Sequence, residues 1–172
     1  MPDADAELDD ELSLLVEVAR EAGKLSLEWL KKGAKSWDKS PGNPVTEADI
    51  AINDLISKRL RQARPGYGWL SEETKDNPLD RTQDRVWVVD PIDGTKDFVK
   101  GEAGFCVSIA RLEGRQPVAG VVYNPLLDEL FAARVGGGAT MNGKPVRVTT
   151  HSELSCRMVG QPDVFVRGGA AK

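Results

Sequence analysis

The segment WVVDPIDGT at residues 87–95 runs from an apolar stretch into two carboxylates three positions apart, Asp90 and Asp93. Two carboxylates and the backbone carbonyl between them are the hard oxygen ligands that Mg²⁺ and similar cations prefer. Gly94 and Thr95 follow at once and offer N–H groups and a hydroxyl, which suit an anion if a helical turn comes next. A cation beside an anion is what a metal-bridged phosphate requires. The alternative is a plain strand end followed by an ordinary Asp-Gly turn.

A second pair of acids follows another short apolar run. Glu72 and Glu73 come directly after Trp69 and Leu70. If two strands end side by side, these carboxylates reach the same sheet edge as the aspartates; if not, they belong to a solvated acidic loop. Lys39 precedes them in a polar loop. It is either a surface lysine or, beside clustered acids, a holder of a metal-bound water or a phosphate.

Asp49 is open to two interpretations that are compatible. Thr46-Glu47-Ala48-Asp49 fits the capping-box pattern, with Thr46 as N-cap. Such a cap stabilises a helix by about 1 kcal/mol and needs no further role. A helix N-terminus that points at the sheet edge can also hold a catalytic carboxylate.

The elements that must position these residues follow from the hydrophobic pattern. Apolar residues recur at three- and four-residue spacing from Leu8 to Leu30 and predict a long amphipathic helix that ends near Lys31–Gly33. The segment Ser36–Pro44 is expected to be a polar loop. A second helix is predicted from Thr46 to about Arg64.

Beyond residue 66 the pattern becomes that of short strands linked by turns such as Asn124-Pro125 and Asn142-Gly143. We therefore expect an α+β fold in one domain, with two long helices packed on a mostly antiparallel β-sheet. The predicted strands are Tyr67–Leu70, Val86–Asp90, Phe105–Leu112, Val118–Tyr123, Leu130–Val135 and Val146–Thr149.

Composition narrows the function classes. With 23 Lys and Arg against 27 Asp and Glu, the net charge is −4, which argues against a nucleic acid polymer as partner. No apolar run is long enough to span a membrane, and the acidic N-terminus is unlike a signal peptide, so we expect a cytoplasmic protein.

The few cysteines and the lone histidine narrow the chemistry further. No C-x-x-C pair exists, so a structural zinc site has no ligands. A disulfide between Cys106 and Cys156 is formally possible, but in a cytoplasmic chain we expect both to be reduced. A Ser-His-Asp triad would depend on His151, which lies in a polar stretch. Any metal would therefore be held by oxygen, which favours Mg²⁺, Mn²⁺ or Ca²⁺.

Taken together, these segments resemble the inositol monophosphatase superfamily of metal-dependent phosphomonoesterases. The resemblance covers roughly residues 8–158, and D-P-I-D-G-T with an upstream E-E and T-E-A-D is a specific combination. It is carried by KSPGNPVTEAD (39–49), LSEE (70–73), WVVDPIDGTKDF (87–98), VSIA and GVVYNP within 105–125, and GATMNGKPVRV (138–148).

The resemblance implies a role for each matching position. It makes Glu72, Asp90, Asp93 and the carbonyl of Ile92 ligands of Mg²⁺, with Mn²⁺ as the alternative ion. Asp49 and Thr95 would orient and deprotonate the attacking water, with Glu72 also in the catalytic set. The N–H groups of Gly94 and Thr95 would hold the substrate phosphate, while Lys39 and Glu73 support the site. Lithium sensitivity and a homodimer are further expectations.

One motif of the family is absent from this sequence. Family members carry a later W-D-x-A-A-G motif whose aspartate completes the metal site, and this sequence has only Trp37-Asp38, in another context. We therefore expect this sequence to form the N-terminal half of the layered α/β phosphatase fold, without the C-terminal domain. Residues 1–159 are expected to form the metal-binding domain, and residues 160–172 a divergent or disordered tail.

We expect the substrate to be a small phosphorylated metabolite. One branch of the superfamily, the 3′(2′),5′-bisphosphate nucleotidases, hydrolyses 3′-phosphoadenosine 5′-phosphate. This sequence is more like that branch in the segment Thr95-Lys96-Asp97-Phe98, which is followed by Lys100. Inositol 1-phosphate, a sugar phosphate and histidinol phosphate are the alternatives within the phosphatase class. A different class, a catalytically impaired metal-binding fragment, also stays open.

Overall fold

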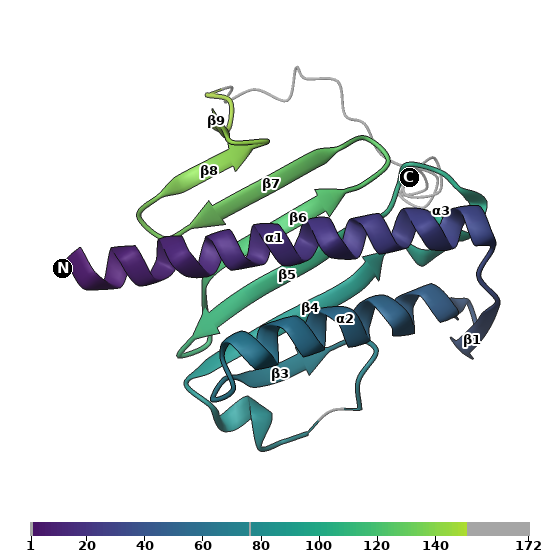
Figure 1. Cartoon of the computed structure of the whole chain (residues 1–172), viewed down its shortest axis with the longest axis horizontal. Helices are drawn as coiled ribbons and strands as arrows, with labels where there is room; N and C mark the ends of the chain where they lie inside the picture. The colour runs from purple at the N-terminus through teal and green to yellow at the C-terminus, as the bar shows by residue number, and fades with distance from the viewer. Residues whose placement is uncertain (1, 76, 151–172) are drawn as a thin grey trace, which may run out of the picture.

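The computed structural model describes residues 2–75 and 77–150 of the chain. Two helices lie on one face of a β-sheet, which confirms the α+β prediction (Figure 1). The boundary expected at residue 159, the tail, Cys156 and His151 lie outside the described residues.

The two long helices are antiparallel neighbours (Figure 1). α1 (Pro2–Lys32) extends six residues further toward the N-terminus than the apolar pattern predicts, and it ends as expected at a pair of lysines. α2 (Glu47–Ala63) has Thr46 as its N-cap. Its capping box is complete, because the Thr46 hydroxyl accepts from the N–H of Asp49 while the Asp49 carboxylate accepts from the N–H of Thr46.

The main sheet of the described residues has seven strands in sequence order from β3 to β9. Only its first pair, β3 with β4, is parallel, so the sheet is mostly antiparallel as predicted. The strands are β3 (Gly68–Ser71), β4 (Arg85–Asp93), β5 (Cys106–Glu113), β6 (Gln116–Asn124), β7 (Glu129–Arg134), β8 (Gly138–Met141) and β9 (Lys144–Val146). Two short helices, η1 (Asp80–Thr82) and α3 (Thr95–Lys100), flank β4 along the chain.

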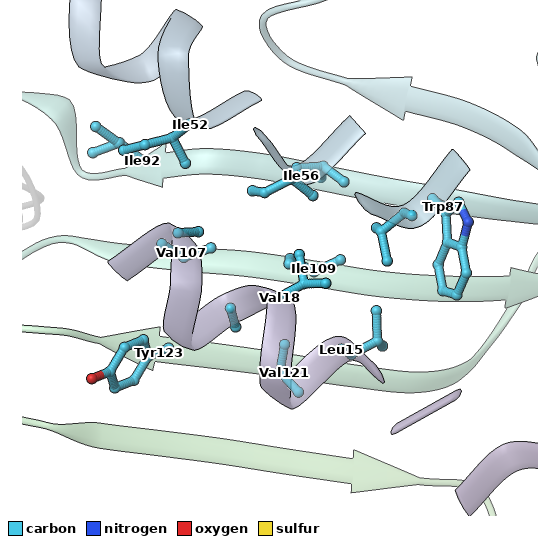
Figure 2. Packing of buried hydrophobic residues seen from close by; sticks show 14 of the residues in the cluster. Leu15, Val18, Ile52, Ile56, Trp87, Ile92, Val107, Ile109, Val121 and Tyr123 are labelled. Carbon is cyan, nitrogen blue, oxygen red and sulfur yellow. The ribbon is translucent and has the colours of Figure 1, made fainter. Parts of the chain in front are cut away.

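The core fills the space between the helices and the sheet. Leu15 and Val18 from α1 and Ile52 and Ile56 from α2 point toward residues of β4, β5 and β6, among them the fully buried Trp87 (Figure 2). This burial of apolar surface is the main stabilising term of the fold. It fixes the position of α2 against β4, on which the site below depends.

Two local predictions were wrong. Residues 36–44 do not form a loop: β1 (Ser36–Ser40) and β2 (Asn43–Thr46) pair as an antiparallel hairpin around Gly42, whose φ of +78° suits glycine. The C-terminal strand predicted over Val146–Thr149 is displaced, because the chain forms β8 and β9 about the Asn142-Gly143 turn instead. In both cases two short strands of mixed polarity pair across a turn that contains glycine. The hydrophobic pattern alone does not reveal such a pairing.

A buried ion pair joins α1 to the sheet at the end opposite β1. Arg111 on β5 and Glu11 on α1 are 1% and 0% exposed, and Arg111 Nε lies 3.0 Å from Glu11 Oε2. The contact is an ion pair rather than a hydrogen bond, since neither atom has a hydrogen-bond partner. The hydroxyl of Tyr67 donates to the other oxygen of Glu11.

The face of β5 to β8 that turns away from the helices is apolar. Val122 on β6 and Phe131 on β7 are register partners and remain 41% and 42% exposed. They border a shallow groove of about 470 Å³. No helix among the described residues is long and apolar enough to cross a membrane.

Candidate active site

The sheet topology brings the acidic segments to one edge. Because β3 and β4 are parallel neighbours, both end on the same side of the sheet, where β1, α3 and the N-terminus of α2 also lie (Figure 1). Glu72 follows β3, and its N–H donates to the carbonyl of Val89 on β4 over 3.2 Å. The pairing of β4 with β5 is interrupted between Asp90 and Asp93, so the chain bulges where the two aspartates project.

The predicted ligands and phosphate-binding residues line one cleft of about 540 Å³. The start of β2, the acids at the ends of β3 and β4, and much of α3 form its walls. The lining comprises Gly42, Asn43, Pro44, Glu72, Asp90, Ile92, Asp93, Gly94, Thr95, Lys96, Asp97, Lys100 and Glu102.

Negative charge is concentrated in the cleft. Burial raises the pKa of Asp90 to about 7, and the neighbouring carboxylates of Glu72 and Asp93 add to the increase. Lys39 pairs with two of the acids: its Nζ lies 3.7 Å from Glu72 Oε1 and also contacts Glu73. Glu73 is largely buried, and this burial raises its pKa, while the Lys39 ammonium opposes the increase.

Asp49 lies behind Thr95 rather than in the wall of the cleft. The Thr95 hydroxyl is 3.2 Å from Asp49 Oδ1 and 3.1 Å from the carbonyl oxygen of Ile92. The other oxygen of Asp49 accepts from the N–H and the hydroxyl of Thr46, at 2.8 and 2.6 Å. Asp49 is 1% exposed, and burial raises its pKa despite these bonds. The capping-box interpretation of Asp49 is therefore confirmed, and Asp49 also touches the hydroxyl at the cleft. Its catalytic role stays a prediction.

Gly94 connects the aspartates to α3 in a conformation that only glycine adopts easily. Its φ is +90°, and a Cβ atom there would meet the carbonyl oxygen of Gly104 at 2.4 Å and the Cα of Phe105 at 3.1 Å. Its own carbonyl accepts from the N–H groups of Asp97 and Phe98, which begins the helix. The close packing of this turn sets the direction of the Thr95 side chain.

The donor set fits a hard divalent cation in its chemistry. Three carboxylates and the carbonyl of Ile92 are all oxygen ligands, and a concentrated negative charge favours a cation. Within the described residues, no group of three or more His, Cys, Asp or Glu side chains is arranged so that it could hold a metal ion as it stands. Closing these ligands around an ion requires side-chain rotation, which costs little for Glu72, because its side chain is 49% exposed.

The site therefore gathers the predicted residues in two layers. Glu72, Asp90, Ile92, Asp93, Gly94 and Thr95 line the cleft. Outside the lining, Lys39 contacts Glu72, Asp49 contacts Thr95, and Glu73 contacts Lys39. Seven further residues that the sequence did not assign to the site also line the cleft, namely Gly42, Asn43, Pro44, Lys96, Asp97, Lys100 and Glu102. For Lys96, Asp97 and Lys100 the available signal was the segment Thr95–Phe98 with Lys100, which the sequence analysis used for the substrate rather than for the site.

Comparison with known proteins places the chain in a family. The family model described as "Inositol monophosphatase family" matches residues 7–162. The chain belongs to the inositol monophosphatase family. This confirms the superfamily seen in the sequence, and the match spans most of the chain.

Individual relatives of the family agree with this assignment. Inositol monophosphatase 1 of Solanum lycopersicum is 39% identical over 155 residues, which are 89% of this chain and 57% of that protein. Inositol-1-monophosphatase of Mesorhizobium japonicum is 41% identical over 151 residues, 87% of this chain and 56% of that one. The chain thus spans somewhat more than half the length of the curated relatives it matches.

The fold agrees as well. The crystal structure of the extragenic suppressor protein suhB from Bartonella henselae superimposes with a TM-score of 0.78 at 34% identity. The match covers 83% of this chain and 55% of that one. The IMPase of Thermotoga maritima also superimposes, with a TM-score of 0.72 at 33% identity over 84% of this chain and 54% of that one, so the helices and mostly antiparallel sheet are those of an inositol monophosphatase fold.

Proposed function

We propose that this protein is a Mg²⁺-dependent phosphatase that hydrolyses phosphate monoesters of small molecules. The observation that carries the proposal is the contact of the buried Asp49 with the Thr95 hydroxyl, directly beside a cleft lined by Glu72, Asp90 and Asp93. A crystal structure described as an IMPase/NADP phosphatase complexed with Mg²⁺ and phosphate supports the choice of ion and substrate class. It is 25% identical to this chain, with a TM-score of 0.73.

The cleft residues divide the work of hydrolysis among them. Glu72, Asp90, Asp93 and the carbonyl of Ile92 would hold the cation, with Mn²⁺ as the alternative ion. When bound, the ion supplies a Lewis acid that neutralises phosphate charge and activates a water. The remaining steps belong to residues of the chain.

Thr95 and Asp49 would act on the attacking water. The Thr95 oxygen accepts a hydrogen bond from the water and passes its own proton toward Asp49 Oδ1, 3.2 Å away. The raised pKa of Asp49 makes its carboxylate a better proton acceptor than a solvated aspartate. As the proton of the water moves to the Thr95 oxygen, the water oxygen attacks phosphorus in line. The bond to the ester oxygen breaks, and that oxygen takes a proton from the solvent. The N–H groups of Gly94 and Thr95 would orient the phosphate.

For the substrate we propose 3′-phosphoadenosine 5′-phosphate first. Lys96 and Lys100 line the cleft beside Thr95 and can meet a second phosphate. Lys96 is exposed and has no ion-pair partner among the described residues. Inositol 1-phosphate has equal support from the relatives' names, and histidinol phosphate has support from the histidinol-phosphatase of Chlorobaculum parvum, which is 38% identical.

The test is phosphate release from these three substrates by the 172-residue chain, with Mg²⁺ and with a chelator. A parallel sample joins the chain to the part of the Solanum lycopersicum relative that it does not cover. We expect Mg²⁺-dependent release from both, with much slower turnover by the short chain, because its cleft is open to water and electrostatic stabilisation weakens there. No release from either sample would favour the alternative, a catalytically impaired metal-binding protein.

Metal binding is tested separately by titration calorimetry with Mg²⁺ and Mn²⁺. Asp90→Asn and Asp93→Asn are expected to weaken binding while the fold is retained, because each removes a negative charge from the cleft. Equal affinity in the wild type and both variants would contradict the assignment. Lithium inhibition, a homodimer and a cytoplasmic location stay predictions.

A further inference from the structure

One buried polar residue beside the site has no role in the chemistry proposed above. Asn53 lies on α2, four residues after Asp49, and is only 6% exposed. Residues four apart lie on the same face of a helix, so the face that presents Asp49 to Thr95 also carries Asn53. A buried amide needs hydrogen-bond partners, and its partners show what it holds in place.

Asn53 binds both ends of the turn that contains Glu72 and Glu73. The Ser71 hydroxyl donates to Asn53 Oδ1 over 2.6 Å, and Asn53 Nδ2 donates to Thr74 Oγ1 over 3.2 Å. One amide side chain thus bridges the residue before the two glutamates and the residue after them.

Further hydrogen bonds complete the turn around this bridge. The Ser71 hydroxyl accepts from the N–H of Glu73 at 3.2 Å, and the indole N–H of Trp69 donates to Thr74 Oγ1 at 3.2 Å. On the sheet side, the N–H of Glu72 donates to the carbonyl of Val89. The backbone of the turn is therefore held by α2 on one side and by β4 on the other, while the Glu72 side chain stays 49% exposed.

We propose that Asn53 is a positioning residue, which fixes the turn of residues 71–74 so that Glu72 faces the cation site and Glu73 faces Lys39. In this arrangement α2 sets the distance between two parts of the site: Asp49 fixes the hydroxyl of Thr95, and Asn53 fixes the glutamate turn. The proposal rests on the proposed function insofar as Glu72 is a cation ligand. Removing a residue that orients a metal ligand by hydrogen bonding typically lowers metal affinity or activity 10–100-fold.

A purely structural role for Asn53 makes a different prediction. If the amide only satisfies buried hydrogen bonds, its loss lowers the stability of the fold and leaves cation affinity unchanged. Two measurements on the 172-residue chain separate the roles. One is Mn²⁺ binding followed by electron paramagnetic resonance, and the other is hydrogen exchange of the peptide that spans residues 70–75 without metal.

The variants are Asn53→Ala and, as a matched control, Ile56→Val. Ile56 is fully buried on the same helix one turn later, away from the turn, so its shortening lowers stability without touching the glutamates. A second pair tests the bridge from its other end: Thr74→Val removes the hydroxyl, whereas Thr74→Ser keeps it.

We expect Asn53→Ala and Thr74→Val to accelerate exchange in residues 70–75 and to weaken Mn²⁺ binding by about 10–100-fold. Ile56→Val and Thr74→Ser should bind Mn²⁺ as the wild type does, whatever their melting temperatures. Wild-type affinity in Asn53→Ala would overturn the proposal, with or without faster exchange. If the wild type itself bound no Mn²⁺, the proposed function would fail. In that case the exchange measurement still tests the role of Asn53, because unchanged exchange in Asn53→Ala would show that the amide does not hold the turn.

Discussion

Replacing Gly94 by alanine tests how the turn between the aspartates and α3 is built. Two costs are expected. A residue with a Cβ at positive φ costs roughly 1–2 kcal/mol, and the φ of Gly94 is +90°. The new Cβ would also lie 2.4 Å from the carbonyl oxygen of Gly104, so the backbone of one segment must move. Overpacking of this kind costs typically about 1–3 kcal/mol.

The sum is a loss of about 2–5 kcal/mol in the free energy of unfolding, from the two contributions above. Gly101 provides the matched control at the other end of the same short helix. Its φ is +73°, but a Cβ there would have no heavy atom within 4 Å. Gly101→Ala should therefore cost only the first part, roughly 1–2 kcal/mol.

The assay is urea unfolding of the wild type and both variants, together with Mn²⁺ titration of each. Gly94→Ala is expected to be less stable than Gly101→Ala and to bind Mn²⁺ more weakly, because the displaced turn carries Asp93 and Thr95. If the two variants lost the same stability, the close approach to Gly104 would not be part of the folded state, and the reasoning about this turn would be refuted.

Four further outcomes follow from the structure. Arg111→Met should lower the free energy of unfolding by about 3–5 kcal/mol, since it removes the closest cation from the buried Glu11, and adding Glu11→Leu should restore much of the loss in urea unfolding. Thr95→Ala should reduce kcat by on the order of 10²–10³ with a much smaller change in substrate affinity; a variant that kept kcat and lost affinity would make Thr95 a binding residue. Lys96→Met should raise KM for 3′-phosphoadenosine 5′-phosphate more than for inositol 1-phosphate, and equal effects would argue against a second phosphate at this lysine. The 172-residue chain should self-associate through its apolar sheet face, and Phe131→Lys should shift it toward the monomer in size-exclusion chromatography; an unchanged elution would locate the contact elsewhere.

The sequence alone was sufficient for the two long helices and for most strands. The apolar spacing in residues 8–30 and 46–64 predicted both long helices. This periodicity can be read from the local sequence, because the apolar face of an amphipathic helix is the face that packs against the core. The central strands were predicted to within a few residues for the same reason. The hairpin of β1 and β2 and the strand β8 were missed and β9 was misplaced, because their stability comes from pairing partners rather than from an apolar pattern of their own.

The sequence also named the residues of the site but not their arrangement. D-P-I-D-G-T and the capping box at Thr46 are local patterns, and the resemblance that they carry is enough to indicate the family. That Glu72 meets Asp90 depends on β3 and β4 being parallel neighbours, which no local pattern states. The raised pKa of Asp90 likewise requires burial and like charges from separate segments.

What only the tertiary structure decided is how α2 serves the site. In the sequence, Asp49 is a capping-box residue and a candidate catalytic carboxylate, and Asn53 is an unremarkable polar residue. Packing of Ile52 and Ile56 against β4 turns the polar face of the helix toward Thr95 and the glutamate turn. The physical reason is that burying the apolar side of a helix also fixes where its polar neighbours point, and the partners they meet there lie 18 to 46 residues away along the chain.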